Sequence, residues 1–167
     1  GAAGALSEPF VDASFDFYGK TLSGQPEQRP QWKRSLGSVN GSMGQALGQL
    51  YVAKYFTPEA KARAKELVDN IREALKARIQ NLDWMSAETK QKALDKWSKF
   101  LPKIGYPDHW RSWDGLNITK DNYYANLEAA QKFNNDYDIA KIGKPTDRKE
   151  WGMTPQTVNA YYNPTDN

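Results

Sequence analysis

The sequence predicts a mainly α-helical chain that ends in a loop and one short β-strand. Between about residues 31 and 140, apolar side chains recur at spacings of three and four in four stretches, which is the period of helices with one buried face. This pattern stops at Gly143-Lys144-Pro145, because glycine and proline end helices. Residues 157–162 then combine β-branched and aromatic side chains, which favour a strand, and Pro164 limits that strand on its far side.

The first helix is expected from about Gln31 to Tyr55. Its apolar stripe consists of Trp32, Leu36, Val39, Met43, Leu47, Leu50 and Tyr51. Four glycines lie along the same stretch: Gly37, Gly41, Gly44 and Gly48. Each costs up to about 1 kcal/mol relative to alanine inside a helix, and close approach of another backbone would offset that cost.

The second helix has the clearest start signals. Thr57 can cap it, Pro58 suits its first position, and Glu59 favours the positive end of the helix dipole. Its apolar face is formed by Ala60, Ala64, Leu67, Val68, Ile71, Leu75, Ile79 and Leu82. The other side carries charges of alternating sign, which is more typical of a solvated surface than of a nucleic-acid-binding surface.

A turn separates the second helix from the third. Ser86 is the expected cap of the third helix, which ends near Phe100, before Pro102, and turns Ala93, Leu94 and Trp97 inward. The fourth helix is expected from about residue 121 to 140, with an apolar stripe of Tyr124, Leu127, Ala130 or its neighbour Ala129, Phe133 and Tyr137. A long irregular loop, residues 102–120, connects these two helices.

Composition excludes several classes of protein. An apolar content of 39% and an aromatic content of 13% exclude a disordered chain. A net charge of +3, from 23 basic and 20 acidic side chains, is too small and too evenly mixed to indicate a nucleic-acid partner. No apolar run approaches the roughly 20 residues that cross a bilayer, so no membrane segment is expected. The absence of cysteine excludes disulfides, thiolate catalysis and cysteine zinc sites.

The single histidine, His109, argues against a catalytic site in this chain. A zinc site of the H-E-x-x-H type needs two histidines one helical turn apart. A Ser-His-Asp triad needs only one, but His109 lies in a turn-rich loop and no Gly-x-Ser-x-Gly elbow occurs in the sequence. His109 is therefore expected to be a surface loop residue, and we expect no catalytic residue and no metal site here.

Five stretches of the sequence stand out together: Pro30-Gln31-Trp32-Lys33-Arg34, Ala46-Leu47-Gly48-Gln49-Leu50-Tyr51-Val52, Leu82-Asp83-Trp84-Met85, Lys103-Ile104-Gly105-Tyr106-Pro107, and Trp151 with Val158-Asn159-Ala160-Tyr161-Tyr162. These stretches resemble the neprilysin and endothelin-converting-enzyme family of zinc metallopeptidases, in its bacterial oligopeptidase branch. They occur in the family's order and spacing, from about Phe15 to the last residue.

The resemblance implies a two-lobed enzyme, with a helical shell lobe facing a thermolysin-like lobe that carries zinc. Residues 1–142 would be a helical part of the shell lobe, and residues 143–167 a linker and the first strand of an incomplete catalytic lobe. In that strand Asn159 would hold a peptide substrate with its side-chain amide and Ala160 with its backbone. The physical chemistry agrees, since an edge strand offers unpaired backbone groups to a peptide and asparagine both donates and accepts.

The family's zinc helix and its third ligand, a glutamate, would lie downstream of Asn167. Zinc is therefore implied as the cofactor of a parent enzyme that hydrolyses peptide bonds in oligopeptides, and this chain alone is expected to be inactive. The alternative is a non-catalytic helical module that binds a peptide or a protein partner. A reading frame that continues past Asn167 into an H-E-x-x-H helix would favour the enzyme, and a stop codon there would favour the module.

Two further expectations concern location and association. The bacterial resemblance suggests a periplasmic or secreted protein, with any signal upstream of this chain; a cytoplasmic location stays open, because the lack of cysteine does not fix the compartment. Without the rest of the shell and the catalytic lobe, apolar faces of the helices would be exposed, and large exposed apolar patches usually associate. We therefore expect self-association of this segment.

Overall fold

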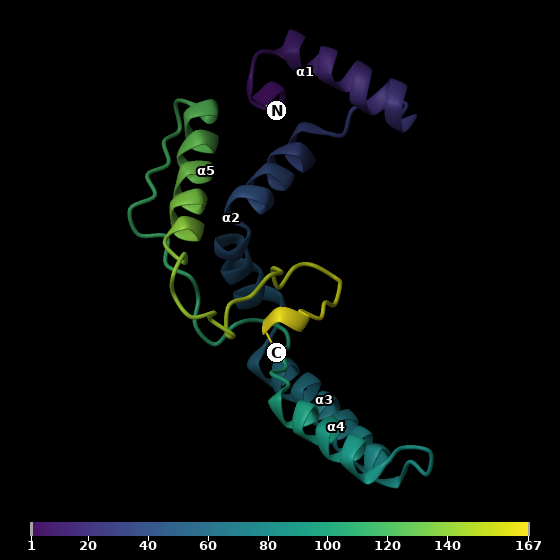
Figure 1. Ribbon diagram of the computed structural model, residues 1–167. Helices are drawn as coiled ribbons and strands as arrows, with labels where there is room; N and C mark the ends of the chain where they lie inside the picture. Colours follow the sequence, from purple (N-terminus) through teal and green to yellow (C-terminus); the bar gives the residue numbers. More distant parts are fainter. Residues whose placement is uncertain (1, 167) are drawn as a thin grey trace. The chain divides into compact units, whose positions relative to one another are not determined.

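The structure is a computed structural model that describes residues 2–166, and within this range the chain is mainly α-helical, as predicted. The chain divides into two compact units. Unit 1 comprises Gly1–Leu47 and Arg111–Lys144, and unit 2 comprises Gly48–Trp110 and Pro145–Asn167. The boundary between them falls inside α2 (Gln31–Tyr55), the blue helix in Figure 1.

Unit 1 begins with helices that the sequence analysis did not anticipate. The short 3₁₀ turn η1 (Ala2–Ala5) is followed by α1 (Glu8–Ser14), which continues into the π-helical segment η2 (Phe15–Leu22). Val11, Phe15, Tyr18 and Leu22 do recur at spacings of four, three and four, so the helical pattern was present in the sequence and was missed. Pro9 near the helix start and Glu8 in its first turn were further signals.

Unit 1 also contains α5 (Tyr123–Ile139), close to its predicted bounds. Its N-terminus is capped by Asn122, whose side chain accepts a hydrogen bond from the Ala125 amide at 3.0 Å. Ala130, on the predicted stripe, is only 1% exposed. The Arg111 guanidinium stacks on the Tyr137 ring of this helix at 3.8 Å and so ties the preceding loop to α5.

Helix α2 has the predicted bounds but is broken at Met43, whose φ of −134° and ψ of 34° lie outside the helical region. A break in a helix frees backbone carbonyls, which then need other donors. The Ser42 carbonyl accepts a hydrogen bond from Asn134 Nδ2 of α5, at 2.9 Å. The break is thus stabilised by a residue more than ninety positions away in the sequence, and no local pattern indicates it.

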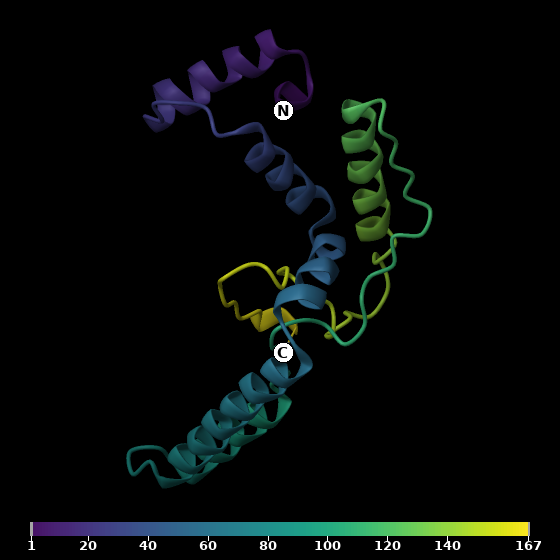
Figure 2. The ribbon, with the colours of Figure 1, turned by 180° about the vertical axis from the view of Figure 1, so that it is seen from behind.

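Unit 2 contains the antiparallel pair α3 (Pro58–Asn81) and α4 (Ala87–Lys99), which lie side by side in Figures 1 and 2. Both predicted caps are confirmed: the Thr57 and Ser86 side chains accept from the amides three residues on, at 3.3 and 3.2 Å. Trp97 of α4 links the two helices. Its indole Nε1 donates to the Arg72 carbonyl of α3 at 2.9 Å, and the Arg72 guanidinium lies over its ring.

The apolar face of α3 is only partly covered. Val68 and Ile79 are half-buried, whereas Leu67, Ile71 and Leu75, spaced four residues apart, are 62%, 58% and 43% exposed. These last three residues form what we call the α3 stripe. Such a row of exposed aliphatic side chains lacks the contacts that normally stabilise an amphipathic helix.

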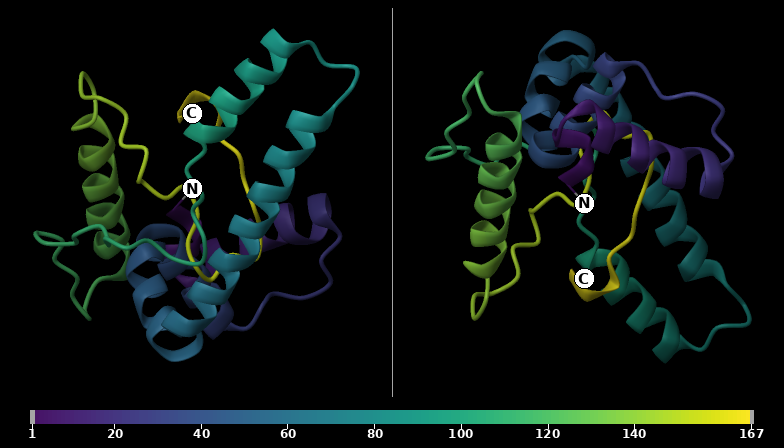
Figure 3. Two further views of the ribbon diagram at one scale, coloured as in Figure 1. Left: turned by 90° about the horizontal axis from the view of Figure 1, so that it is seen from below. Right: turned by 90° about the horizontal axis from the view of Figure 1, so that it is seen from above.

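The predicted strand at residues 157–162 is wrong, because this segment is irregular and no β-strand occurs anywhere in residues 2–166. Figure 3 shows the C-terminal segment, in yellow, as a coil that ends in the short 3₁₀ turn η3 (Pro164–Asp166). Its amides are bonded locally: Thr157 N donates to Thr154 O at 3.0 Å, and Asn159 N donates to Thr157 O at 3.1 Å. A strand needs a neighbouring strand for its ladder, and the described residues provide none.

The substitution Asn134→Ala is expected to lower the free energy of unfolding by about 1 kcal/mol, because the Ser42 carbonyl loses its donor. The matched control is Asn135→Ala, since Asn135 is exposed on the same helix and its side chain makes no hydrogen bond within residues 2–166. Urea unfolding followed by circular dichroism measures both. Equal midpoints for the two variants would contradict the role given to Asn134.

Candidate functional site

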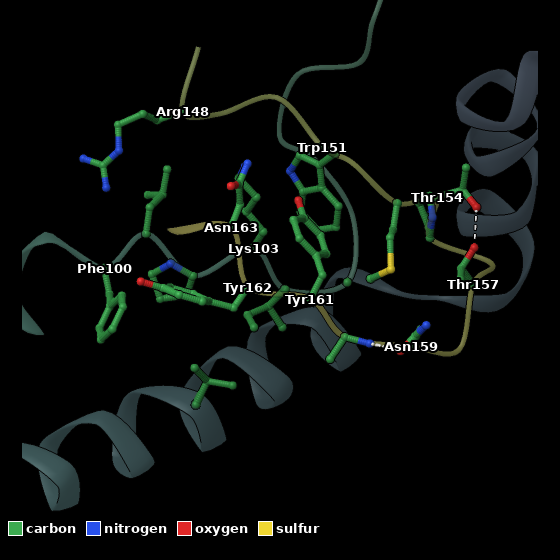
Figure 4. A pocket seen from close by; sticks show the side chains of 18 of the residues that line it. Phe100, Lys103, Arg148, Trp151, Thr154, Thr157, Asn159, Tyr161, Tyr162 and Asn163 are labelled. Atoms are coloured by element: carbon green, nitrogen blue, oxygen red, sulfur yellow. Dashed lines mark hydrogen bonds between the residues drawn. The ribbon is translucent and has the colours of Figure 1, made fainter. Parts of the chain in front are cut away.

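Unit 2 contains a cavity of about 630 Å³, which lies within the usual size range of ligand sites. Its walls come from the loop after α4, residues 100–105, and from the C-terminal segment, residues 148–163, with a few side chains of α2 and α3. Figure 4 shows its aromatic interior, with Trp151 beside Tyr161. We call this cavity the pocket.

The first wall, residues 100–105, is held in place where the Gly105 backbone comes close to the Phe56 ring, which only glycine permits. Gly105 has φ +75°, and a Cβ at this position would lie 2.4 Å from Cε1 of the Phe56 ring. The rings of Phe56 and Tyr106 then meet edge to face, with centroids 5.7 Å apart, and Tyr106 stacks on Trp110 at 6.3 Å. The Gly105-Tyr106-Pro107 sequence therefore anchors the loop to the end of α2.

Lys61 of α3 fastens the same loop. Its Nζ donates to the Tyr106 carbonyl and to Asp108 Oδ1, both at 2.7 Å, and lies 4.2 Å from the centre of the Tyr106 ring. The hydrogen bond from Lys61 and its positive charge lower the pKa of Asp108 below its ordinary value. Both Lys61 contacts span more than forty residues of sequence, so the pairing was not readable from local patterns.

The second wall is joined to the first by long-range contacts. Lys103 Nζ donates to the Glu150 carbonyl at 2.5 Å, and the rings of Phe100 and Tyr162 meet edge to face at 6.0 Å. Within the segment, the Gly152 amide donates to the Tyr161 hydroxyl at 3.1 Å.

The C-terminal segment also packs on α2. A Cβ on Gly48 would lie 2.8 Å from Cδ of Pro155, so glycine is required there for a close contact with a side chain of another segment. At Gly37 and Gly41 no atom of the described chain lies within 4 Å of such a Cβ. Another segment therefore comes close to α2 at Gly48, where the contact is with a proline side chain and not with the expected backbone, and none does so at Gly37 or Gly41.

Asn159 and Ala160, the predicted substrate-binding residues, both line the pocket. Asn159 Oδ1 accepts a hydrogen bond from the Ala160 amide at 2.8 Å, so these two groups satisfy each other. Within residues 2–166, Asn159 Nδ2 and the carbonyls of both residues make no hydrogen bond. One donor and two acceptors therefore remain for a ligand at this edge of the pocket.

The residues present do not fit a zinc ion. Among residues 2–166, no group of three or more histidine, cysteine, aspartate or glutamate side chains could hold a metal. His109 is an exposed loop residue, as the sequence analysis predicted.

Comparisons with known proteins identify the family. A family model described as peptidase family M13 matches residues 1–107. Neprilysin-3 of Drosophila melanogaster is 35% identical, with 97% of this chain and 21% of the relative covered. An endothelin-converting enzyme homolog of Locusta migratoria is 34% identical, with 97% and 23% covered.

The fold matches a solved bacterial structure. The zinc metalloprotease ZMP1 of Mycobacterium tuberculosis in its open state is similar to this chain with a TM-score of 0.87 and 47% identity, over 98% of this chain and 25% of that protein. The chain therefore belongs to the M13 peptidases, the family of neprilysin and the endothelin-converting enzymes, and the predicted resemblance is confirmed. It spans about a fifth to a quarter of the length of these relatives.

No helix in the described residues combines the length and the apolar character that a membrane crossing requires.

The pocket contains residues that the sequence analysis did not assign to a site. Lys103 and Tyr161 were noted only within family-like stretches, and Arg72 and Arg148 carried no signal. Their roles depend on contacts such as the one between Lys103 and Glu150, which are 47 residues apart. A short-range pattern cannot indicate a pairing of that kind.

Stability is expected to depend on Asp108 at acid pH. Because folding lowers its pKa, the stabilisation is present above the unfolded value of about 3.9 and is lost as pH falls through the folded value. Asp108 is exposed, so the loss should stay below about 1 kcal/mol. Asp108→Asn should remove this part of the pH dependence, and Asp83→Asn, at an exposed aspartate without an ion pair in residues 2–166, should not. Urea midpoints at neutral and acid pH test this, and identical pH slopes for Asp108→Asn and the unmodified chain would contradict it.

Proposed function

We propose that this chain is the part of an M13 zinc metallopeptidase that holds the main chain of a peptide substrate. The observation that carries the proposal is the position of Asn159 and Ala160 on the wall of the pocket, with one donor and two acceptors unused. The whole enzyme would hydrolyse peptide bonds in oligopeptides. Its zinc ligands would come from residues outside this chain.

In this proposal Asn159 and Ala160 are held in the binding conformation before the peptide arrives. The hydrogen bond from the Ala160 amide to Asn159 Oδ1 fixes the carboxamide, so that Nδ2 is oriented before a ligand arrives. Nδ2 would donate to a substrate carbonyl, and the Ala160 carbonyl would accept from a substrate amide. The small Ala160 side chain leaves room for the substrate backbone beside it.

The proposal also covers the organisation of the whole enzyme. Residues 1–142 would belong to its shell lobe, and residues 143–167 would lead into its catalytic lobe. A periplasmic or secreted location fits the similarity to a bacterial relative with 47% identity. Cell fractionation with an antibody against this chain tests the location.

Removing the Asn159 amide should weaken peptide binding. Asn159→Ala is expected to raise the Kd of an end-blocked extended peptide about five-fold, the value of one hydrogen bond. Asn159→Asp keeps the acceptor for the Ala160 amide but loses the Nδ2 donor, so it should weaken binding of an uncharged peptide at least as much. Isothermal titration calorimetry measures the affinities.

The control for these variants is Asn117→Ala, at an exposed loop position outside the pocket. It should leave the affinity unchanged. Equal affinities for Asn159→Ala, Asn159→Asp and the unmodified chain would sink the proposed role of Asn159.

We further propose that this chain associates with itself through the α3 stripe, Leu67, Ile71 and Leu75. These side chains are exposed on one face of one helix, and a contiguous aliphatic row of this kind favours association in water. In the whole enzyme, other parts of the protein would cover the same face.

Ile71→Lys should shift the chain toward the monomer, because burying an unpaired charge in the contact is unfavourable. Gln80→Lys adds the same charge at an exposed position of α3 outside the stripe and serves as the control. Sedimentation velocity over a range of concentrations gives the distribution of species. A monodisperse monomer for the unmodified chain would rule out this association.

A further inference from the structure

All charged side chains that line the pocket are positive. Its lining includes Arg72, Lys103 and Arg148 but no aspartate or glutamate. The rest of its surface is largely aromatic and aliphatic, so water screens charges inside it less than it does at an open surface. A pocket with this composition favours a ligand that is partly apolar and carries a negative charge.

Lys103 is the cation in this pocket whose charge has no counterpart. The side chain is half-buried, and its Nζ donates to the Glu150 carbonyl, but within residues 2–166 no carboxylate lies at ion-pair distance. Lys61, in the same unit, is paired with Asp108. Lys103 retains two N–H donors beyond its bond to Glu150.

The two arginines have other partners. Arg148 donates to the Lys99 carbonyl at 2.5 Å. The Arg72 guanidinium lies over the Trp97 ring with its Nη1 3.9 Å from Asp69, although its Nε is buried without a hydrogen-bond partner in residues 2–166. At Lys103 an incoming carboxylate would form a charged hydrogen bond where no ion pair now exists.

We propose that Lys103 forms a carboxylate-binding subsite for the peptide that Asn159 and Ala160 hold, so that the preferred ligands are acidic peptides. This inference rests on the proposed function, since it assumes that a peptide lies along the same pocket. In the view of Figure 4, Trp151 and Tyr161 lie between Lys103 and Asn159. A peptide that spans these two residues would thus cross an aromatic surface. The carboxylate comes either from an acidic side chain or from the free C-terminus.

The test compares peptides that differ only in charge. In a short extended peptide with blocked ends and one phenylalanine, glutamate is placed at each position in turn and paired with its glutamine counterpart. A second pair carries a free or an amidated C-terminus. The Kd of each peptide for the full chain is measured by calorimetry at low ionic strength.

The expected result is a preference of about five-fold for one charged peptide over its neutral counterpart, which is the size of a partly exposed ion pair. The member of the series with the largest ratio shows whether a side chain or the C-terminus supplies the carboxylate. Lys103→Met should bring that ratio to about one, and Lys103→Arg should preserve it. Lys92→Met, on the exposed side of α4, is the matched control and should leave the ratio unchanged.

The ratio compares the Kd values of a charged and a neutral peptide for the same protein. A general loss of stability in Lys103→Met would weaken both peptides equally and would leave this ratio unchanged. A ratio of about one for every pair on the unmodified chain would overturn the inference, as would a preference that survives in Lys103→Met. A failure of the proposed function appears differently, as equal affinity of Asn159→Ala and the unmodified chain for the neutral peptides.

Discussion

The approach of the Gly105 backbone to the Phe56 ring is the contact on which the pocket depends. Any side chain at position 105 would both meet that ring and strain the backbone, whose φ of +75° favours glycine. Once the loop is seated, Lys61 can reach the Tyr106 carbonyl and Lys103 can reach the Glu150 carbonyl. One small residue thus positions the first wall of the pocket, and that wall fixes the C-terminal segment which carries Asn159.

Helix caps and specific side-chain contacts stabilise the described chain more than a large apolar core does. Ala130 and Pro107 are the buried apolar side chains of the described residues, and the α3 stripe is largely exposed. Helices with so little burial rely on capped ends, on Trp97 between α3 and α4, and on the bond from Asn134 to the broken helix. This balance is understandable in a chain that spans about a fifth to a quarter of the length of its relatives, because the missing contacts would come from the rest of such a protein.

Much of the helical structure could be predicted from the sequence, because its signals are local. Thr57 and Ser86 marked the starts of α3 and α4, and both act as caps. The break at Met43 could not be predicted, since its compensating donor lies on α5. The β-strand prediction failed because residues 157–162 have the composition of a strand but no ladder partner in the described chain. The prediction of Asn159 as a binding residue rests on the family resemblance, whereas the proposal for Lys103 depends on three-dimensional contacts such as its bond to Glu150.

The central claim, that the pocket holds the main chain of a peptide through Asn159 and Ala160, is tested most directly by nuclear magnetic resonance. In the ¹⁵N-labelled chain, the Ala160 amide and the Asn159 side-chain amide report on the two groups involved. Titration with an extended peptide should shift both signals in a saturable way, with the Lys103 amide changing in parallel. Unchanged signals at residues 159 and 160, together with shifts confined to the α3 stripe, would contradict the account.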